Sequence, residues 1–308
     1  MAEKRTKSKG GAKKWLIYIV LLILIAVTIA EGKGYNPVEW LKSQIGGTTE
    51  KFDEKLTVNF IDVGQGDCIL VSSSDENMLI DCGEASQAEA VENYLNDAGV
   101  LRLDYVIMTH PHSDHAGGMA TIIRNYDVGE VIMPELADND IPSTRYFEQF
   151  LDACEEKNLQ ITDAQLGRTI KLGDTSAEII APNSGDYSSV NNYSVAIMMT
   201  HGKNKFLFTG DAETLAENEM LNSRKLSHVD VYKAGHHGSD TSSSEEFLKV
   251  ISPDYAVIMC GAGNSYGHPN DVVLERLLEY TNNIYRTDLN GNIIFESDGI
   301  NLQVRTEK

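Results

Sequence analysis

The sequence predicts an α/β protein built as a four-layer αββα sandwich behind one N-terminal transmembrane helix. Three observations lead to this prediction. Strand-like and helix-like segments alternate from residue 56 onward, the same order occurs before and after about residue 165, and the uncharged run 15–30 follows a basic cluster. Two similar halves, each a mixed sheet with helices on one outer face, would then pack sheet to sheet. No Pro- or Gly-rich linker divides them, so residues 56–308 are expected to form one domain.

The composition is that of a folded, acidic protein. The chain has 308 residues, of which 42% are hydrophobic and 23% are charged, and these values exclude wholesale disorder. The net charge is −20, but residues 1–30 carry six basic side chains and one acidic side chain, which leaves −25 on residues 31–308. Such an acidic body argues against a general binder of polyanions.

The N-terminal residues predict an attachment to the cytoplasmic membrane. Residues 1–14 form a basic cytoplasmic segment, 15–30 a single-pass signal anchor, and 31–55 a stalk. A membrane crossing takes about 17–25 helical residues, so the run is short, although Lys14 and Lys33 can snorkel. A cleaved signal peptide is the alternative, with 28–30 as a weak cleavage site. The body is extracytoplasmic in both cases, anchored in the first and secreted in the second.

The elements of the first half follow from alternating and helical apolar patterns. Strands are expected at 56–62, 67–72, 78–81, 105–109 and 130–133, where apolar runs end at turn residues. Helices are expected at 87–98, 118–125 and 145–157. The first of these repeats apolar residues at Val91, Tyr94 and Leu95, which fall on one helical face.

The second half repeats this order. Strands are expected at 176–180, 194–200, 206–209, 229–233, 255–259, 284–286, 292–296 and 299–304, and helices at 212–222, 245–251 and 271–280. Ser244 and its two preceding serines open one helix as a cap. The four cysteines show no metal-site spacing, so they are interpreted as buried free thiols: Cys68, Cys82, Cys154 and Cys260.

The strongest chemical signal is the loop between the strand 105–109 and the next helix. Three imidazoles and a carboxylate lie within six residues, at His110, His112, Asp114 and His115. In an extended loop His110 and His112 point the same way, because side chains alternate with period two. Asp114 and His115 then turn toward a neighbouring position. Imidazole suits Zn, Mn, Fe and Ni, and carboxylate adds a harder ligand, so the loop predicts two adjacent metals.

Three further segments place polar side chains at strand ends. Asp211 follows the strand 206–209, where an Asp alone is most often a helix N-cap. His236 and His237 follow the strand 229–233, and His268 lies after the strand 255–259. Since α/β sheets place their sites at the carboxyl ends of strands, these side chains are expected near the histidine loop.

Together these motifs resemble a known family. The pattern HxHxDHxGG, a strand ending in Gly-Asp and later histidines are similar to the metallo-β-lactamase-fold hydrolases. The segments 60–67 (FIDVGQGD), 79–83 (LIDCG), 191–194 (NNYS), 236–239 (HHGS) and 266–269 (YGHP) resemble the C-terminal domain of the DNA-uptake competence protein ComEC and its free-standing relatives. The resemblance covers about residues 56–300. It implies this αββα fold, hydrolytic activity, and one or two Zn²⁺ or Mn²⁺ ions.

The resemblance also implies metal ligands. One metal would be held by His110 and His112, the other by Asp114, His115 and His268, with Asp211 bridging the two. Dinuclear relatives carry a further His about thirty residues before the bridging Asp, where this chain has Ala181. The first metal would therefore bind loosely, or take Asn, water or substrate as a ligand.

Five other residues receive roles through the same resemblance. Asp81 would brace the histidine loop by hydrogen bonds, and His236 or His237 would face the leaving group or a phosphoryl oxygen. Gln65 and Asn192 would contact substrate. For Gln65 and Asn192, an ordinary turn residue is the alternative interpretation.

The predicted reaction is metal-assisted hydrolysis. A metal lowers the pKa of bound water from about 15.7 to about 7 and polarises the scissile oxygen. Asp114 or Asp211 can orient that water, and His236 or His237 can stabilise the developing charge. The sequence has no phosphate-binding P-loop and no G-x-S-x-G elbow, so no nucleotide cofactor and no serine triad are expected.

The resemblance favours a phosphodiester as the substrate, either in nucleic acid or in a cell-envelope polymer such as teichoic acid. The acidic body opposes nucleic acid, whose binding rests on Lys and Arg. Two alternatives remain: a lactone or lactam hydrolase, and a catalytically degenerate metal-binding scaffold of a DNA-uptake system.

Overall fold

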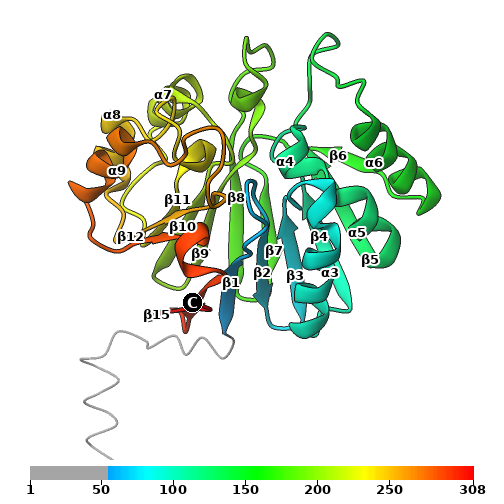
Figure 1. The fold of residues 1–308 in the computed structure, drawn as a ribbon, viewed down its shortest axis with the longest axis horizontal. Coiled ribbons are helices and arrows are strands. Elements are labelled where there is room, and N and C mark those ends of the chain that lie inside the picture. Colours follow the sequence, from blue (N-terminus) through cyan, green and yellow to red (C-terminus); the bar gives the residue numbers. More distant parts are fainter. Residues whose placement is uncertain (1–54) are drawn as a thin grey trace, which may run out of the picture. The chain divides into compact units, whose positions relative to one another are not determined.

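Two β-sheets face each other in the part of the chain that the structure, a computed structural model, describes, residues 55–308 (Figure 1). The first sheet has eight strands in the order β15-β14-β1-β2-β3-β4-β5-β6, and the second has seven in the order β13-β12-β11-β10-β9-β8-β7. The predicted transmembrane segment 15–30, the basic segment and nearly all of the stalk lie outside the described residues. Within residues 55–308, no helix has both the length and the apolar character that a membrane crossing needs.

The first half supplies six strands of the first sheet. Its strands are β1 (Leu56–Phe60), β2 (Ile69–Ser73), β3 (Glu76–Ile80), β4 (Arg102–Ile107), β5 (Asp127–Met133) and β6 (Ile161–Asp163). Its helices are α3 (Ala88–Asp97), α4 (Ser113–Ala116), α5 (Met119–Asn125) and α6 (Arg145–Glu156), with a 3-10 turn η1 (Ala85–Gln87). The strands β1, β2 and β3 pair antiparallel, whereas β3, β4, β5 and β6 pair parallel.

The second half repeats this arrangement. Its strands are β7 (Thr169–Leu172), β8 (Thr175–Ala181), β9 (Ala196–His201), β10 (Asn204–Phe208), β11 (Val231–Lys233), β12 (Tyr255–Ile258) and β13 (Ile284–Arg286). Its helical elements are η2 (Val190–Tyr193), α7 (Thr214–Asn222), η3 (Gly235–Gly238), α8 (Glu245–Ile251), α9 (Asp271–Leu278) and α10 (Thr287–Asn290). The strands β7 to β10 pair antiparallel and β10 to β13 pair parallel.

The C-terminal strands cross back to the first sheet. Strand β14 (Ile293–Ser297) pairs antiparallel with β1, and β15 (Leu302–Thr306) pairs with β14. Every strand and helix predicted within residues 56–308 overlaps an observed one. The strands β6 and β7 were not predicted, because three or four residues are too few to show a period.

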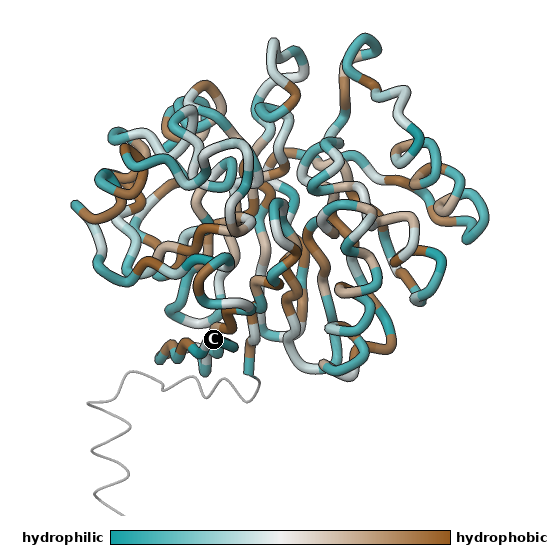
Figure 2. The backbone as a smooth tube through the Cα atoms, in the orientation of Figure 1, coloured by the Kyte–Doolittle hydropathy of each residue, from teal (hydrophilic) through white to brown (hydrophobic). Residues whose placement is uncertain are grey.

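Three hydrophobic clusters confirm the layer order of the sandwich. One cluster lies between the sheets and contains Phe60, Phe206 and Phe295. A second packs the first sheet against α3, α5 and α6, and a third packs the second sheet against α7, α8 and α9. Figure 2 shows hydrophobic residues concentrated along the inner strands and hydrophilic residues along outer turns and loops. The burial therefore produces four layers, α/β/β/α, as the sequence predicts.

The inter-sheet cluster depends on aromatic contacts at Phe295. Its ring centroid lies 5.4 Å from that of Tyr255 and 6.0 Å from that of Phe60. Replacing Phe295 with Ala is expected to lower the free energy of unfolding by about 3–5 kcal/mol, because a large cavity opens between the sheets. Urea unfolding would measure the change. The control Leu101→Ala removes a side chain that is 88% exposed, and it is expected to change stability by less than about 0.5 kcal/mol. A loss below about 1 kcal/mol at Phe295 would contradict the assignment.

Candidate metal centre

The histidine loop follows β4 and enters α4 at the carboxyl ends of the parallel strands. The Nε2 atom of His110 lies 2.9 Å from the Nδ1 atom of His112. The two rings thus share one side of the loop, as period-two alternation predicts. The ring of His110 is buried, whereas that of His112 is exposed. The pair presents two imidazole nitrogens to one point.

Asp81 fixes the other end of this loop. Its Oδ1 atom accepts a hydrogen bond of 2.8 Å from the backbone N–H of Thr109, and its Oδ2 accepts one of 2.6 Å from the Thr109 hydroxyl. The Nδ1 atom of His115 lies 2.7 Å from the same Oδ2. With its Nδ1–H directed to Asp81, His115 keeps the lone pair of Nε2 for a ligand, as metal-binding histidines do. Asp81 therefore makes the hydrogen bonds expected of a bracing residue.

Asp211 lies at the centre of the cluster. Its backbone N–H donates a 3.0 Å hydrogen bond to the Ser194 hydroxyl, which sets its position after β10. Four imidazoles surround its Oδ2 atom through Nε2, at 3.3 Å for His115, 3.4 Å for His237, 3.7 Å for His236 and 3.9 Å for His110. A single carboxylate oxygen thus faces four imidazole nitrogens.

His236 and His237 reach this point through an unusual backbone. Both have left-handed conformations, with φ of 50° and 54°, which non-glycine residues rarely adopt. The Nδ1 atom of His237 lies 2.9 Å from the carbonyl oxygen of Met259, and its Nε2 lies 3.2 Å from Asp114 Oδ2. The turn thereby aims the lone pair of His237 at the centre.

The remaining predicted site residues lie at different distances from the centre. His268 lines the same cavity, but its ring stacks on that of His237 at 6.3 Å, and it is not in the ligand cluster around Asp211. Gln65 also lines the cavity, and its Oε1 accepts a hydrogen bond from the Gly261 N–H. Asn192 does not line it, because its amide donates to Glu213 Oε2 and accepts from the Glu213 N–H. The expectation that Asn192 contacts substrate thus has no support in its position.

Ala181 does not mark an open ligand position. Its side chain is completely buried in the cluster that packs the second sheet against its outer helices. A histidine there would lie in an apolar layer and not beside His110. Asn191 lies closer to the cluster, because its Nδ2 is 3.4 Å from Nε2 of His236, which is 3.7 Å from Asp211 Oδ2.

The electrostatics of the cluster favour positive charge. Burial acts to lower the pKa of His115, but the charges of Asp211 and Asp81 outweigh burial and raise this pKa well above its usual value. The pKa of His237 is raised in the same way by Asp211 and Asp67. Burial lowers the pKa of His110 well below its usual value, so this ring is neutral. Burial would raise the pKa of Asp211, but the nearby charges of His237 and His115 hold it well below its ordinary value.

These residues fit a divalent cation. The ligand atoms of Asp67, His115, Asp211 and His237 lie within 4.8 Å of one another, and all four side chains are buried. The Oδ1 atom of Asp211 is buried and makes no hydrogen bond within residues 55–308. Imidazole nitrogens and carboxylate oxygens are the ligands that Zn²⁺ and Mn²⁺ accept. The cluster therefore has the donors, the charge and the spacing of a metal site.

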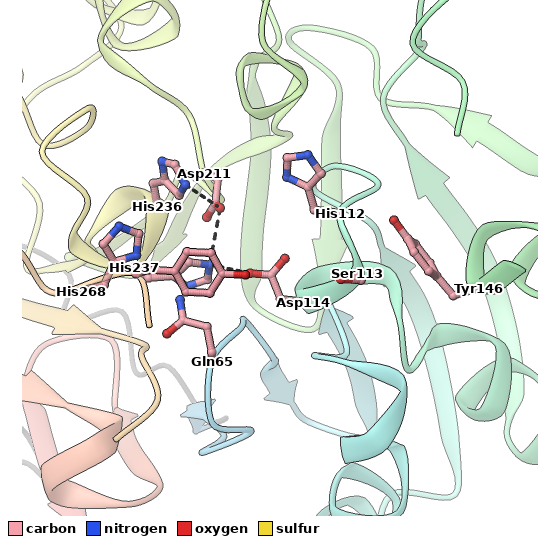
Figure 3. Close-up of a pocket in the computed structure, with 10 residues that line it drawn as sticks. Gln65, His112, Ser113, Asp114, Tyr146, Asp211, His236, His237 and His268 are labelled. Carbon is pink, nitrogen blue, oxygen red and sulfur yellow. Dashed lines mark ion pairs between the residues drawn. The ribbon is translucent and has the colours of Figure 1, made fainter. Parts of the chain in front are cut away.

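A cavity of about 310 Å³ opens onto this cluster. Figure 3 shows Asp114, Asp211 and His237 converging in the cavity. Gln65 lies below them in this view, and His112 and Tyr146 lie to their right. None of the ten residues that line the cavity is Lys or Arg. Positive charge beside this cavity thus comes from its histidines, such as His237, and from any cation bound at the cluster.

Two buried residues at this centre, Asp67 and Lys233, are not among the site residues that the sequence predicts. Asp67 follows β1 in the motif that resembles the competence proteins, and Lys233 ends β11. Their side chains form an ion pair. A Lys at the end of a buried strand, three residues before two histidines, is the signal that could have drawn attention to Lys233.

The fold and the centre define a class of protein. Residues 61–262 match the Metallo-beta-lactamase superfamily, and the chain belongs to this superfamily. Among solved structures, the metallo-beta-lactamase fold protein YhfI from Bacillus subtilis is similar with a TM-score of 0.54 and 12% identity, covering 79% of this chain and 100% of that one. The diiron β-hydroxylase CmlA from Streptomyces venezuelae is similar with a TM-score of 0.52 and 14% identity, covering 76% and 53%. At these identities the likeness shows the fold.

The chain is also similar to curated proteins of the ComEC-like competence group. It is 31% identical over 254 residues to ComE operon protein 3 of Bacillus subtilis (strain 168), covering 77% of this chain and 32% of that protein. It is 33% identical over 241 residues to Recombination protein 2 of Haemophilus influenzae, covering 77% and 28%. Competence protein ComA of Neisseria gonorrhoeae is 28% identical over 288 residues, covering 91% and 38%. The chain thus spans about a third of the length of these relatives.

Proposed function

We propose that this protein is a metal-dependent hydrolase that cleaves a phosphodiester of nucleic acid or of a cell-envelope polymer. The observation that carries the proposal is the convergence of four imidazoles on Asp211 Oδ2 at the floor of an open cavity. Buried carboxylates and imidazoles beside a cavity are a costly arrangement for a protein that only needs stability.

The geometry supports two cation positions on either side of Asp211. His110 and His112 would hold one cation, and His236 lies close enough to Asp211 to support it. Asp114, His115 and His237 would hold the other, since their ligand atoms lie within 3.9 Å of one another. His237 thus takes the place for which the resemblance implied His268. Zn²⁺ and Mn²⁺ are the proposed ions.

The residues around the cavity would divide the remaining tasks. A divalent cation held there would supply Lewis acidity and lower the pKa of water toward about 7. Asp114 faces the cavity and would orient the attacking water by accepting its hydrogen bond. His236, which lines the cavity, would face the leaving oxygen and stabilise its developing charge by a hydrogen bond. Gln65, with its carbonyl fixed by Gly261, keeps two amide N–H donors for a substrate oxygen.

Hydrolysis of bis-(p-nitrophenyl) phosphate, measured with purified protein and added Mn²⁺ or Zn²⁺, tests the reaction. We expect turnover that is abolished by a chelator and restored by the metal. Nitrocefin hydrolysis in place of phosphodiester hydrolysis would favour a lactam as substrate. Two bound metals per chain without either activity would favour a metal-binding scaffold, a role consistent with the competence proteins among the relatives.

We also propose that residues 15–30 anchor the protein in the cytoplasmic membrane with its catalytic domain outside. Deleting residues 1–30 is expected to move the protein from the membrane fraction to the soluble fraction, because the deletion removes the apolar run and its basic flank. Cell fractionation followed by immunoblotting measures this. A full-length protein whose mature form begins after residue 30 would instead show that the segment is a cleaved signal peptide.

A further inference from the structure

Lys233 is a completely buried cation beneath the metal centre. Its side chain has 0% exposure at the end of β11, and its Nζ donates a 3.0 Å hydrogen bond to the carbonyl oxygen of Gly210. Nζ also contacts Asp67 Oδ2 and lies 3.7 Å from Asp211 Oδ1. Removing an ammonium from water is expensive, so a protein keeps one inside only where oxygens surround it. Burial would lower the pKa of Lys233, but Asp67 and Asp211 raise it, and the side chain is charged.

Asp67 joins this lysine to the histidines. It comes from the loop between β1 and β2 of the first sheet, whereas Lys233 belongs to the second sheet. Its Oδ1 atom lies 3.3 Å from His237 Nδ1, and its Oδ2 lies 3.9 Å from His115 Nδ1. A ligand atom of Asp67 also lies within 4.8 Å of ligand atoms of Asp211, His115 and His237, so both carboxylates belong to the candidate cluster. A further interaction is needed to favour one of the two carboxylates, Asp67 or Asp211, as the metal ligand.

We propose that Lys233 is a positioning residue of the metal centre. Its ammonium forms an ion pair with Asp67 and so keeps that carboxylate from acting as a metal ligand. The same ammonium holds Asp211 with its Oδ2 atom toward the imidazoles. This inference rests on the metal centre of the proposed function. The two oxygens of Asp211 support it, since Oδ2 faces four imidazoles whereas Oδ1 faces Lys233 and makes no hydrogen bond within the described chain. A carboxylate without that cation on one side could rotate about its Cβ–Cγ bond.

The positive charge of Lys233 does not by itself explain its place beneath the metal centre. A lone ammonium would repel a divalent cation, but Asp67 lies in contact with Lys233 and cancels its charge at longer range. The ion pair therefore adds no net charge to the centre. Its effect on a bound cation is orientation, and removing both charges together should reveal that effect.

The double variant Asp67→Asn with Lys233→Met makes this test, because it leaves the net charge of the protein unchanged. Affinity for Zn²⁺ is measured by competition with a chelating dye, and the coordination geometry by the visible absorption of bound Co²⁺. We expect affinity about tenfold lower than in the wild type, the usual effect of removing a residue that orients a ligand, and a changed Co²⁺ spectrum. Wild-type affinity with an unchanged spectrum would overturn the inference, since a merely structural ion pair would move neither.

A matched control is the pair Glu130→Gln with Arg168→Met. Arg168 donates two hydrogen bonds of 2.7 and 2.8 Å to Glu130, and neither residue lines the cavity. This variant loses an ion pair and keeps its net charge, so its metal affinity is expected to equal that of the wild type. A loss as large as that of the Asp67/Lys233 variant would mean that the effect comes from general loosening, and would overturn the inference.

Two further measurements keep the outcomes distinct. If this double variant fails to fold, Asp67→Asn with Lys233→Gln removes both charges and keeps a hydrogen-bond donor near Gly210. It is expected to show the same loss of affinity, and wild-type affinity would contradict the inference. Wild-type protein that binds no cation would overturn the metal centre itself, and with it this role of Lys233. Cation binding by the wild type with an unaffected variant would overturn the role of Lys233 alone.

Discussion

Replacing Asp211 with Ala is expected to lower phosphodiester hydrolysis by about three orders of magnitude while the domain stays folded. A bound cation would supply several kcal/mol of charge stabilisation in the transition state, and each change of about 1.4 kcal/mol is tenfold in rate, so losing a carboxylate that holds the cation is costly. Its carboxylate is the point on which the nitrogens of His110, His115, His236 and His237 converge. Without it the two cation positions would share no ligand.

His112→Ala is expected to have the same direction of effect, since it removes one of the two nitrogens that meet at 2.9 Å. The rate with bis-(p-nitrophenyl) phosphate, the bound metal per chain and the melting temperature should be measured on the same samples. Arg168→Met with Glu130→Gln serves as a control that alters an ion pair away from the cavity. Wild-type rates in both the Asp211 and the His112 variants would refute the proposed hydrolytic site.

The sequence predicts the fold well because local patterns determine it. Each strand and helix predicted within residues 56–308 overlaps an observed one, and the halves repeat an antiparallel and then a parallel part, as the order of segments indicates. The histidine loop is predictable for the same reason. Its four candidate ligands lie within six residues of one another, and a strand-to-loop geometry suffices to bring His110 and His112 together.

The part of the site that the sequence does not predict depends on contacts between distant segments. Asp67 and Lys233 are 166 positions apart and meet only because the two sheets pack face to face. The resemblance implies that Asn192 contacts substrate, but both the nitrogen and the oxygen of its side-chain amide are hydrogen-bonded to Glu213. Ala181 stands at the expected spacing, but its side chain points into the outer apolar layer. No local pattern contains this information.

The second large effect is expected from the histidine that serves as a metal ligand, which is either His237 or His268. A straight strand end would carry the side chains of His236 and His237 to opposite sides, so the sequence offers no reason to prefer His237. Two successive left-handed residues change this, since they turn His237 Nε2 to within 3.2 Å of Asp114 and 3.4 Å of Asp211. His268 is left to stack against His237 at the cavity wall.

Replacing His237 with Ala is therefore expected to remove one of two bound metals per chain and to lower hydrolysis by about three orders of magnitude, as for a direct ligand. The matched variant His268→Ala should keep both metals, because it removes a wall of the cavity and not a ligand. Inductively coupled plasma mass spectrometry on both variants, with wild type beside them, measures the stoichiometry. The reverse result, with metal lost on changing His268 and retained on changing His237, would mean that the cation draws the 266–269 segment inward and that His268 is the ligand. Both side chains line one cavity and stack on each other. A general effect of truncation would therefore appear in both variants. A loss of metal in one variant alone would identify that residue as the ligand.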